Sequence, residues 1–245
     1  MTWPFENDTS GIVKRISNRS ISANRKRNIF IVLTIALASA LLSAIVLYGF
    51  GVMQETQNRN QKTAQIMYHA ISEQQGQELY KQEEIAWVGE FFNAFSEQVN
   101  HSTVNFTYAN ADMLTSQSMP YSGDLPASEN EIVVQESFLD SLGYSNELGQ
   151  TIQIPFSDGT THDFKLTGIL DVKTGDIGRY TAIISKELVR QQYGDGGMID
   201  YYIGLKGAQN MSEEEATNYA NTLAQQLKIS DDNVIVRSTY FNLKD

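Results

Sequence analysis

The sequence of 245 residues contains no cysteine and only three histidines. Without cysteine the chain has no disulfide, no thiol nucleophile and no thiolate metal ligand, so a folded domain must be stabilised by its own core. The histidines, His69, His101 and His162, lie far apart and lack the spacing of metal ligands. The sequence also has no G-x-x-x-x-G-K-[ST] phosphate loop and no G-x-S-x-G nucleophile motif. We therefore predict that the chain is not an enzyme and binds neither a cofactor nor a metal.

Charge is absent from residues 29–53, whose sequence is IFIVLTIALASALLSAIVLYGFGVM. At about 1.5 Å per residue, a helix of this length exceeds a hydrocarbon core of about 30 Å. It also lacks the polar stripe of a soluble core helix. We predict a transmembrane helix. The alternative is a cleaved signal peptide, but the small residues that could form a cleavage site, Ala38-Ser39-Ala40, lie in the middle of the apolar run.

Small residues recur on one side of this helix. Ala36, Ala40 and Ala44 are spaced by four residues, and Ser39 and Ser43 occupy the adjacent row. Small side chains at this spacing let a second helix approach closely in lipid, which predicts a helix-packing face. The alternative is that alanine and serine are merely tolerated at these positions.

The charge differs on the two sides of the apolar segment. Residues 1–28 contain six basic and two acidic residues, a net charge of +4, so the remainder carries −15 to give the chain total of −11. The positive-inside rule places the leader, residues 1–28, in the cytoplasm and residues 54–245 outside the cell membrane. Ile12, Val13, Ile16 and Ile21 could share the apolar face of a helix along the inner membrane surface. The acidic part argues against nucleic acid as a partner.

The remainder predicts an α+β fold. After a stalk at residues 54–64, residues 65–245 form an extracytoplasmic domain or two small subdomains. Apolar alternation predicts strands, at 65–71, 104–108, 131–134, 150–156, 162–170, 181–185, 200–206 and 233–237. Capping boxes begin helices after Ser72 and Ser212, and shorter helices are predicted at 137–142, with Gly143 as the C-cap, and at 186–192.

Three further segments are assigned by composition. Residues 85–95, IAWVGEFFNAF, have apolar residues at helical spacing, but their aromatic content and Gly89 favour a strand. Residues 111–130 are rich in Ser, Pro, Gly and Asp and predict a loop, as do residues 173–178 and 193–197. His69, on the first strand, is predicted to be a structural histidine with a satisfied partner.

The order of these segments resembles the N-terminal part of MacB/FtsX-like ABC transporter permeases of the Gram-positive type. Residues 18–42, NRSISANRKRNIFIVLTIALASALL, resemble the basic entry into the family's first membrane helix. Residues 68–70 and 85–89 are similar to the start of its ectodomain, and residues 123–134 resemble its Gly-x-x-Pro … Asn-Glu-Ile-Val segment. Further similar segments follow in the same order as in the family, at residues 142–143, 148–152 and 166–169.

The resemblance implies a membrane permease subunit that couples a separate cytoplasmic ATP-binding subunit to a MacB-like extracytoplasmic domain. It implies a second permease copy or half as partner, and the export or sensing of peptides, antibiotics or lipoproteins. One departure is that family permeases have three or more membrane helices after this domain, and no such run occurs before Asp245. The alternative is a single-pass, membrane-anchored extracellular binding module without transport activity.

Overall fold

The computed structural model describes residues 9–172, 179–194 and 199–242. The chain separates into two compact units, residues 1–57 and residues 58–245. The loop predicted at 173–178, and most of the loop predicted at 193–197, lie outside the described residues. The expected class is confirmed, because a long apolar helix is followed by a mixed α+β domain.

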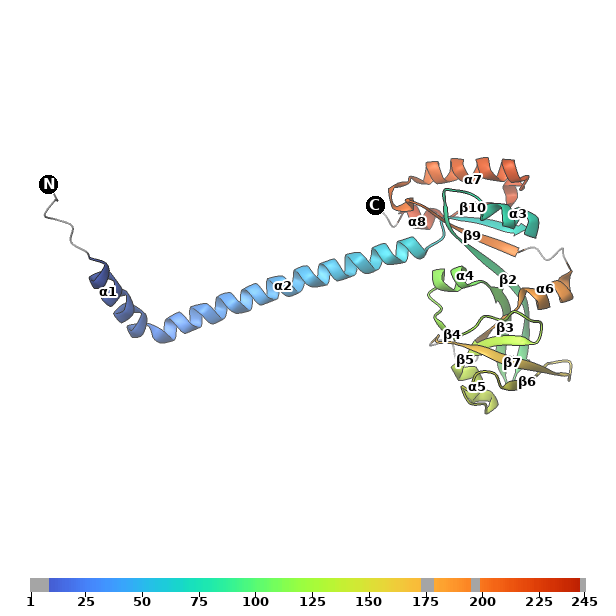
Figure 1. Ribbon diagram of the computed structural model, residues 1–245, viewed down its shortest axis with the longest axis horizontal. Coiled ribbons are helices and arrows are strands. Elements are labelled where there is room, and N and C mark those ends of the chain that lie inside the picture. The colour runs from blue at the N-terminus through green and yellow to red at the C-terminus, as the bar shows by residue number, and fades with distance from the viewer. Residues whose placement is uncertain (1–8, 173–178, 195–198, 243–245) are drawn as a thin grey trace. The chain divides into compact units, whose positions relative to one another are not determined.

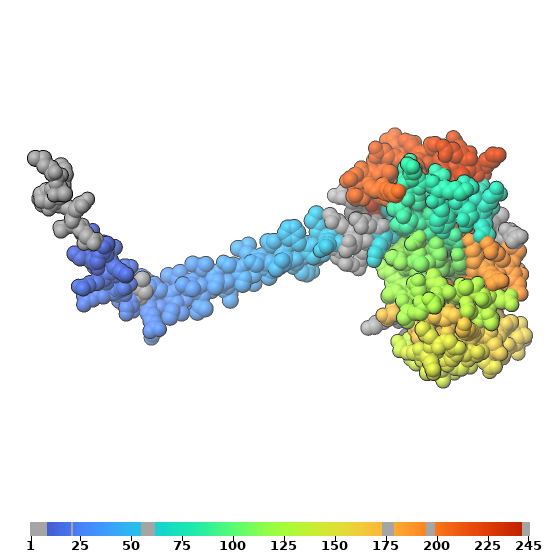
Figure 2. All heavy atoms as spheres, in the orientation of Figure 1, coloured from blue at the N-terminus to red at the C-terminus, as the bar shows by residue number. Residues whose placement is uncertain are grey.

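The N-terminal unit is helical. Helix α1 spans Ser10–Ala23, and helix α2 spans Arg25–Lys62 and continues into the second unit. Within α2, Arg25–Gln54 is the one described segment that is long and apolar enough to cross a membrane. Its large apolar side chains are exposed, and Figure 2 shows this segment in blue. On α1, Ile12, Val13 and Ile16 are also exposed, and a membrane-surface role for this helix stays a prediction.

The second unit contains one mixed ten-stranded sheet with short helices (Figure 1). The strands are β1 Ile66–Ile71, β2 Ile85–Val99, β3 Ser102–Ala109, β4 Tyr121–Gly123, β5 Glu131–Gln135, β6 Thr151–Pro155, β7 Thr161–Leu170, β8 Arg179–Ile184, β9 Ile199–Leu205 and β10 Val234–Val236. The helices are α3 Glu73–Leu79, α4 Ala111–Ser116, α5 Glu136–Leu142, α6 Lys186–Tyr193, α7 Glu213–Leu227 and α8 Ser238–Asn242, with 3-10 turns at Ala208–Asn210 and Asp231–Asn233.

Strand β2 connects the two ends of the sheet. The strand order is β10-β1-β9-β2-β3-β8-β5-β7-β4, and β6 pairs with β7. The first half of β2 pairs with β9, whereas its second half pairs with β3. We call β1, β9, β10, α3 and α7 the first lobe, and β3, β5 to β8, α5 and α6 the second lobe. Figure 1 shows β2 running from one lobe into the other.

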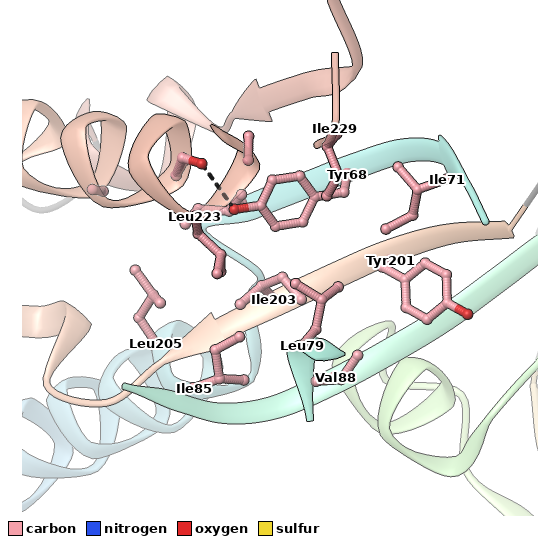
Figure 3. Packing of buried hydrophobic residues seen from close by; sticks show 14 of the residues in the cluster. Tyr68, Ile71, Leu79, Ile85, Val88, Tyr201, Ile203, Leu205, Leu223 and Ile229 are labelled. Carbon is pink, nitrogen blue, oxygen red and sulfur yellow. Dashed lines mark hydrogen bonds between the residues drawn. The ribbon is translucent and has the colours of Figure 1, made fainter. Parts of the chain in front are cut away.

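Each lobe has its own hydrophobic core. In the first lobe, Tyr68 and Ile203 are fully buried between the sheet and α7, and the Tyr68 hydroxyl donates to the carbonyl oxygen of Ala220 at 3.0 Å (Figure 3). In the second lobe, Phe106 and Phe138 are fully buried. Burial of each such large side chain contributes about 1.5–3 kcal/mol, so each lobe has a substantial core.

The capping signals in the sequence are confirmed. Ser72 and Ser212 each form a complete capping box, with Gln75 and Glu215 as the reciprocal partners. Gly143 ends α5 in the left-handed conformation, at φ 78°, which glycine adopts without steric cost. Residues 85–95 are part of a strand, and the other predicted strands are present with small shifts at their ends.

The loop predicted at residues 111–130 is partly wrong. It contains α4 and the three-residue strand β4. Helix α4 is capped by Asn110, whose side chain accepts from the backbone N–H of Met113, and this cap lies just outside the segment that the composition defined. Strand β4 exists because it pairs with β7, a contact between distant segments. Helix α8 was not predicted either.

Gly76 provides a test of the packing in the first lobe. A Cβ atom at Gly76 would lie 2.0 Å from Cζ of Tyr201. Replacing glycine by alanine inside a helix normally stabilises it by about 1 kcal/mol, but here we expect Gly76→Ala to lower the free energy of unfolding by about 1–3 kcal/mol through overpacking. Urea unfolding of residues 58–245 measures this. The same substitution in a Tyr201→Leu background should cost much less, and an unchanged or higher stability of the single variant would contradict the packing described.

Candidate functional site

A buried carboxylate lies where the two lobes meet. Glu90, on β2, is 4% exposed. One carboxylate oxygen accepts from the hydroxyl of Tyr80 at 2.8 Å. The other accepts from the hydroxyl of Tyr108 at 2.6 Å and from Nζ of Lys186 at 2.8 Å. The three donors come from the end of α3, from β3 and from the start of α6, so a single carboxylate joins elements of both lobes.

Lys186 and the next turn of α6 extend this contact to α3. Nζ of Lys186 lies 3.0 Å from Oε1 of Glu73 and 5.7 Å above the ring centroid of Tyr108. Arg190, one turn later on α6, pairs with the same oxygen of Glu73. Figure 2 shows the orange atoms of α6 beside the teal atoms of the first lobe. We call Glu73, Tyr80, Glu90, Tyr108, Lys186 and Arg190 the interlobe cluster.

Local sequence signals place the two helices of the cluster. Ser72 caps α3, so Glu73 is the first helical residue and its negative charge lies at the positive end of the helix. Ser185 is fully buried, and its hydroxyl accepts from the backbone N–H of Leu188 at 3.1 Å. This cap begins α6 at Lys186 and directs the first turn of the helix toward β2.

Asn110 supports the strand that carries Glu90. Its side-chain oxygen accepts from the backbone N–H groups of Glu90 at 3.0 Å and Met113 at 2.9 Å, and its amide donates to the carbonyl oxygen of Val88 at 2.9 Å. One side chain therefore caps α4 and also satisfies backbone groups of β2.

Tyr201, on β9, is the cross-strand partner of Glu90 on β2. Its side chain is fully buried, and its hydroxyl has no hydrogen-bond partner among the described residues. Figure 3 shows this hydroxyl pointing away from Tyr68 and the first core. Burial raises the pKa of Tyr201 above its ordinary value, and the nearby charge of Glu90 raises it further.

The charges of the cluster set the protonation of its members. Burial and the charge of Glu90 raise the pKa of Tyr108, so this tyrosine stays neutral and donates its proton to the carboxylate. The hydrogen bond from Arg190 lowers the pKa of Glu73 below its ordinary value of 4.5. A lowered carboxylate pKa stabilises the fold above that ordinary value, and this contribution is lost as the pH falls through the lowered pKa.

The geometry of the cluster favours a mechanical role. The carboxylate of Glu90 is nearly buried and already accepts from three protein donors, so a substrate has little access to it. Among the described residues, no group of acidic or histidine side chains could hold a metal ion. The cluster fixes the position of α6 against α3 and β2, and thereby the orientation of one lobe to the other.

The residues predicted to form a helix-packing face all lie on α2. Ala36, Ala40 and Ala44 follow one side of the helix and are exposed, with Ser39 and Ser43 beside them. The hydroxyl of Ser43 donates to the carbonyl oxygen of Ser39 at 2.9 Å, so this polar group is satisfied within the helix. No described residue covers this row, and its role in packing stays a prediction.

The three histidines of the sequence are dispersed in the fold. His69 is 56% exposed in its side chain, and its Nδ1 lies 2.7 Å from Oδ1 of Asp200, which is the satisfied partner expected. The interlobe cluster was not identified from the sequence. Its only local signal is Glu90, a charged residue inside the apolar run IAWVGEFF, and its partners are up to 96 positions away.

Removing the charge of Glu90 tests the cluster. Glu90→Gln keeps the shape of the side chain but leaves the partly buried Lys186 with Glu73 as its remaining acidic partner. We expect the free energy of unfolding of residues 58–245 to fall by about 2–4 kcal/mol. The control is Glu78→Gln, which breaks the exposed pair with Lys81 and should cost less than about 0.5 kcal/mol. Equal costs for the two variants would refute the role given to Glu90.

Comparisons with known proteins bear on this fold. A family model described as the MacB-like periplasmic core domain matches residues 29–224. No individually curated protein matches the sequence. Among solved structures, the extracellular domain of the noncanonic ABC-type transporter YknZ from Gram-positive bacteria is similar in fold, with 9% identity and a TM-score of 0.52 over 71% of this chain and 100% of that one. The periplasmic region of MacB from Actinobacillus actinomycetemcomitans has 12% identity and a TM-score of 0.47, over 70% and 86%.

The matched residues, 29–224, begin at the first residue of the apolar segment and cover most of the chain. The resemblance found in the sequence is thereby confirmed. The chain belongs to the family of MacB-like periplasmic core domains.

Proposed function

We propose that this protein is a membrane permease subunit of an ABC transporter of the MacB/FtsX-like type. In this proposal α2 crosses the cell membrane, residues 1–28 stay in the cytoplasm, and the folded domain is extracytoplasmic. The observation that carries the proposal is the family match, which contains the apolar helix and the domain in one continuous stretch. The exposed apolar surface of α2 and the opposite charges on its two sides support it.

The partners proposed are a separate cytoplasmic ATP-binding subunit and a second permease copy or half. The 245 residues contain no G-x-x-x-x-G-K-[ST] phosphate-binding loop, and the proposal assigns ATP binding to a separate subunit. Peptides, antibiotics or lipoproteins are the ligands proposed for export or sensing. The protein itself is proposed to have no enzymatic activity.

A short and well-anchored connection supports the coupling of membrane and domain. Only three residues separate the end of α2 at Lys62 from the start of β1 at Ile66. The last of them, Gln65, is 1% exposed. Its backbone N–H donates to the carbonyl oxygen of Ile203 at 2.9 Å, and its side-chain oxygen accepts from the N–H of Leu205 at 2.7 Å. A movement of the stalk would thus be applied directly to the central strands of the first lobe.

The interlobe cluster would carry that movement further. The salt bridges from α6 to α3 and β2 hold the second lobe to the first. In the proposed mechanism, ATP-driven movement of the membrane helices therefore displaces both lobes together. A membrane-anchored binding module without transport activity is the alternative function. It would need the same anchor but no ATP-binding partner.

The absence of native cysteine allows a clean test of topology. Single cysteines placed at the exposed positions Ser22 and Ser137 report the two sides of α2. In intact cells, a membrane-impermeant maleimide should label Ser137→Cys, and it should label Ser22→Cys only after the membrane is permeabilised. The opposite labelling pattern, or equal labelling of both variants in intact cells, would contradict the proposed orientation.

The small-residue row on α2 should be needed for assembly. A leucine at position 40 would keep helices apart that pack closely over alanine, so we expect Ala40→Leu to reduce recovery of the ATP-binding subunit and second permease copy several-fold. The matched control is Ala38→Leu, which makes the same change about 200° around the helix. Co-purification from membranes of the source cell measures both. Unchanged recovery with Ala40→Leu would remove the support for a packing face.

A further inference from the structure

A cavity of about 250 Å³ lies on the side of the sheet that carries α4. Its floor is formed by β2, β3 and β8, and its wall by α4 and the residues after it. Because side chains alternate along a strand, Asn105 and Thr107 face this cavity, whereas Val104 and Phe106 on the same strand face the second core. We call this cavity the α4 pocket.

Neighbouring strands bring matching polar groups to the floor of the pocket. Asn93 of β2 lies opposite Thr107, and Thr181 of β8 pairs with Asn105. All four side chains line the cavity, and Gln117 adds a further amide from the wall. These contributions come from three strands and the end of one helix, so the cluster is produced by the tertiary fold.

The polar groups of the floor have unused hydrogen-bonding capacity. Thr107 is 6% exposed, and its hydroxyl makes no hydrogen bond to any described residue. The side chains of Asn93 and Thr181 likewise make none within the described part of the chain. The oxygen of Asn105 accepts from the hydroxyl of Ser96 at 2.7 Å, which leaves its amide N–H groups available. These groups open onto the pocket, where water or a ligand can hydrogen-bond to them.

The remaining lining is apolar, and none of it is charged. Phe91, Leu114 and Ile183 provide the apolar surface. A charged ligand group would lose its hydration here without gaining a counter-ion, which disfavours phosphates, carboxylates and amines. An added peptide strand is also disfavoured, because β3 already pairs with β2 on one side and β8 on the other.

We propose that the α4 pocket binds one uncharged, hydroxyl-rich ring, that is, a neutral sugar unit. Each sugar hydroxyl is both a donor and an acceptor, which matches a floor of amides and hydroxyls. The C–H faces of the ring match the apolar surface around Phe91. This sugar site is independent of the proposed transport function. Its occupancy requires neither transport nor an ATP-binding subunit.

The test uses the full chain in phospholipid nanodiscs, with maltose and N,N′-diacetylchitobiose as probes in isothermal titration calorimetry. We expect at least one of the two sugars to bind. Thr107→Val should then raise the dissociation constant of that sugar about 3- to 10-fold, which corresponds to the loss of one neutral hydrogen bond. Because the hydroxyl has no protein partner, the same variant should unfold at an unchanged or higher temperature.

The matched control is Thr103→Val, on the same face of β3 but outside the pocket. The hydroxyl of Thr103 accepts from the side-chain amide of Gln98 at 2.8 Å and does not line the pocket. The dissociation constant of the sugar for Thr103→Val should therefore stay within twofold of the value for the unsubstituted protein. Failure of both sugars to bind would overturn the proposal. So would binding of an uncharged, end-blocked tripeptide in place of sugar, or equal weakening by Thr103→Val and Thr107→Val.

Discussion

The buried carboxylate of Glu90 determines how the two halves of the folded domain fit together. A charge removed from water is tolerated only where charged and polar partners replace the lost hydration. Here the partners are Tyr80, Tyr108 and Lys186, from three different elements. Displacing α3, β3 or α6 would leave the carboxylate without one of its donors. The cost of burying one charge thus becomes a constraint on the arrangement of both lobes.

Apolar packing adds to this constraint, because the rings of Phe92 and Tyr108 lie against the cores of both lobes. Each lobe buries its own set of apolar residues, and the continuous strand that connects them is β2. Strands twist and bend, so backbone continuity leaves the angle between two lobes adjustable. The salt bridges of Lys186 and Arg190 to Glu73 add a further, polar connection. Under the proposed function, a displacement received at Gln65 would be passed on by both lobes together.

Local signals in the sequence predicted most of the elements. Ser72 and Ser212 cap their helices with side chains three residues from their partners, and such contacts form wherever the helix forms. The alternation at 162–170 and Gly143 after α5 are of the same kind. Strand β4 was missed because three residues contain no periodicity, and its strand geometry comes from pairing with β7. Helix α4 was missed because residues 111–130 were assigned to a loop by their composition, and the cap residue Asn110 lies just before that segment.

The order of residues alone determined the apolar helix, the charge difference across it, the α+β class and the family, because these depend on composition, local spacing and motif order. The tertiary structure decided everything that depends on contact between distant positions. Glu90 and Lys186 are 96 positions apart, and no local pattern relates them. Asn93, Thr107 and Thr181 become neighbours only when β2, β3 and β8 pair. Strand register, which follows from how apolar faces are buried together, brings such side chains to one place.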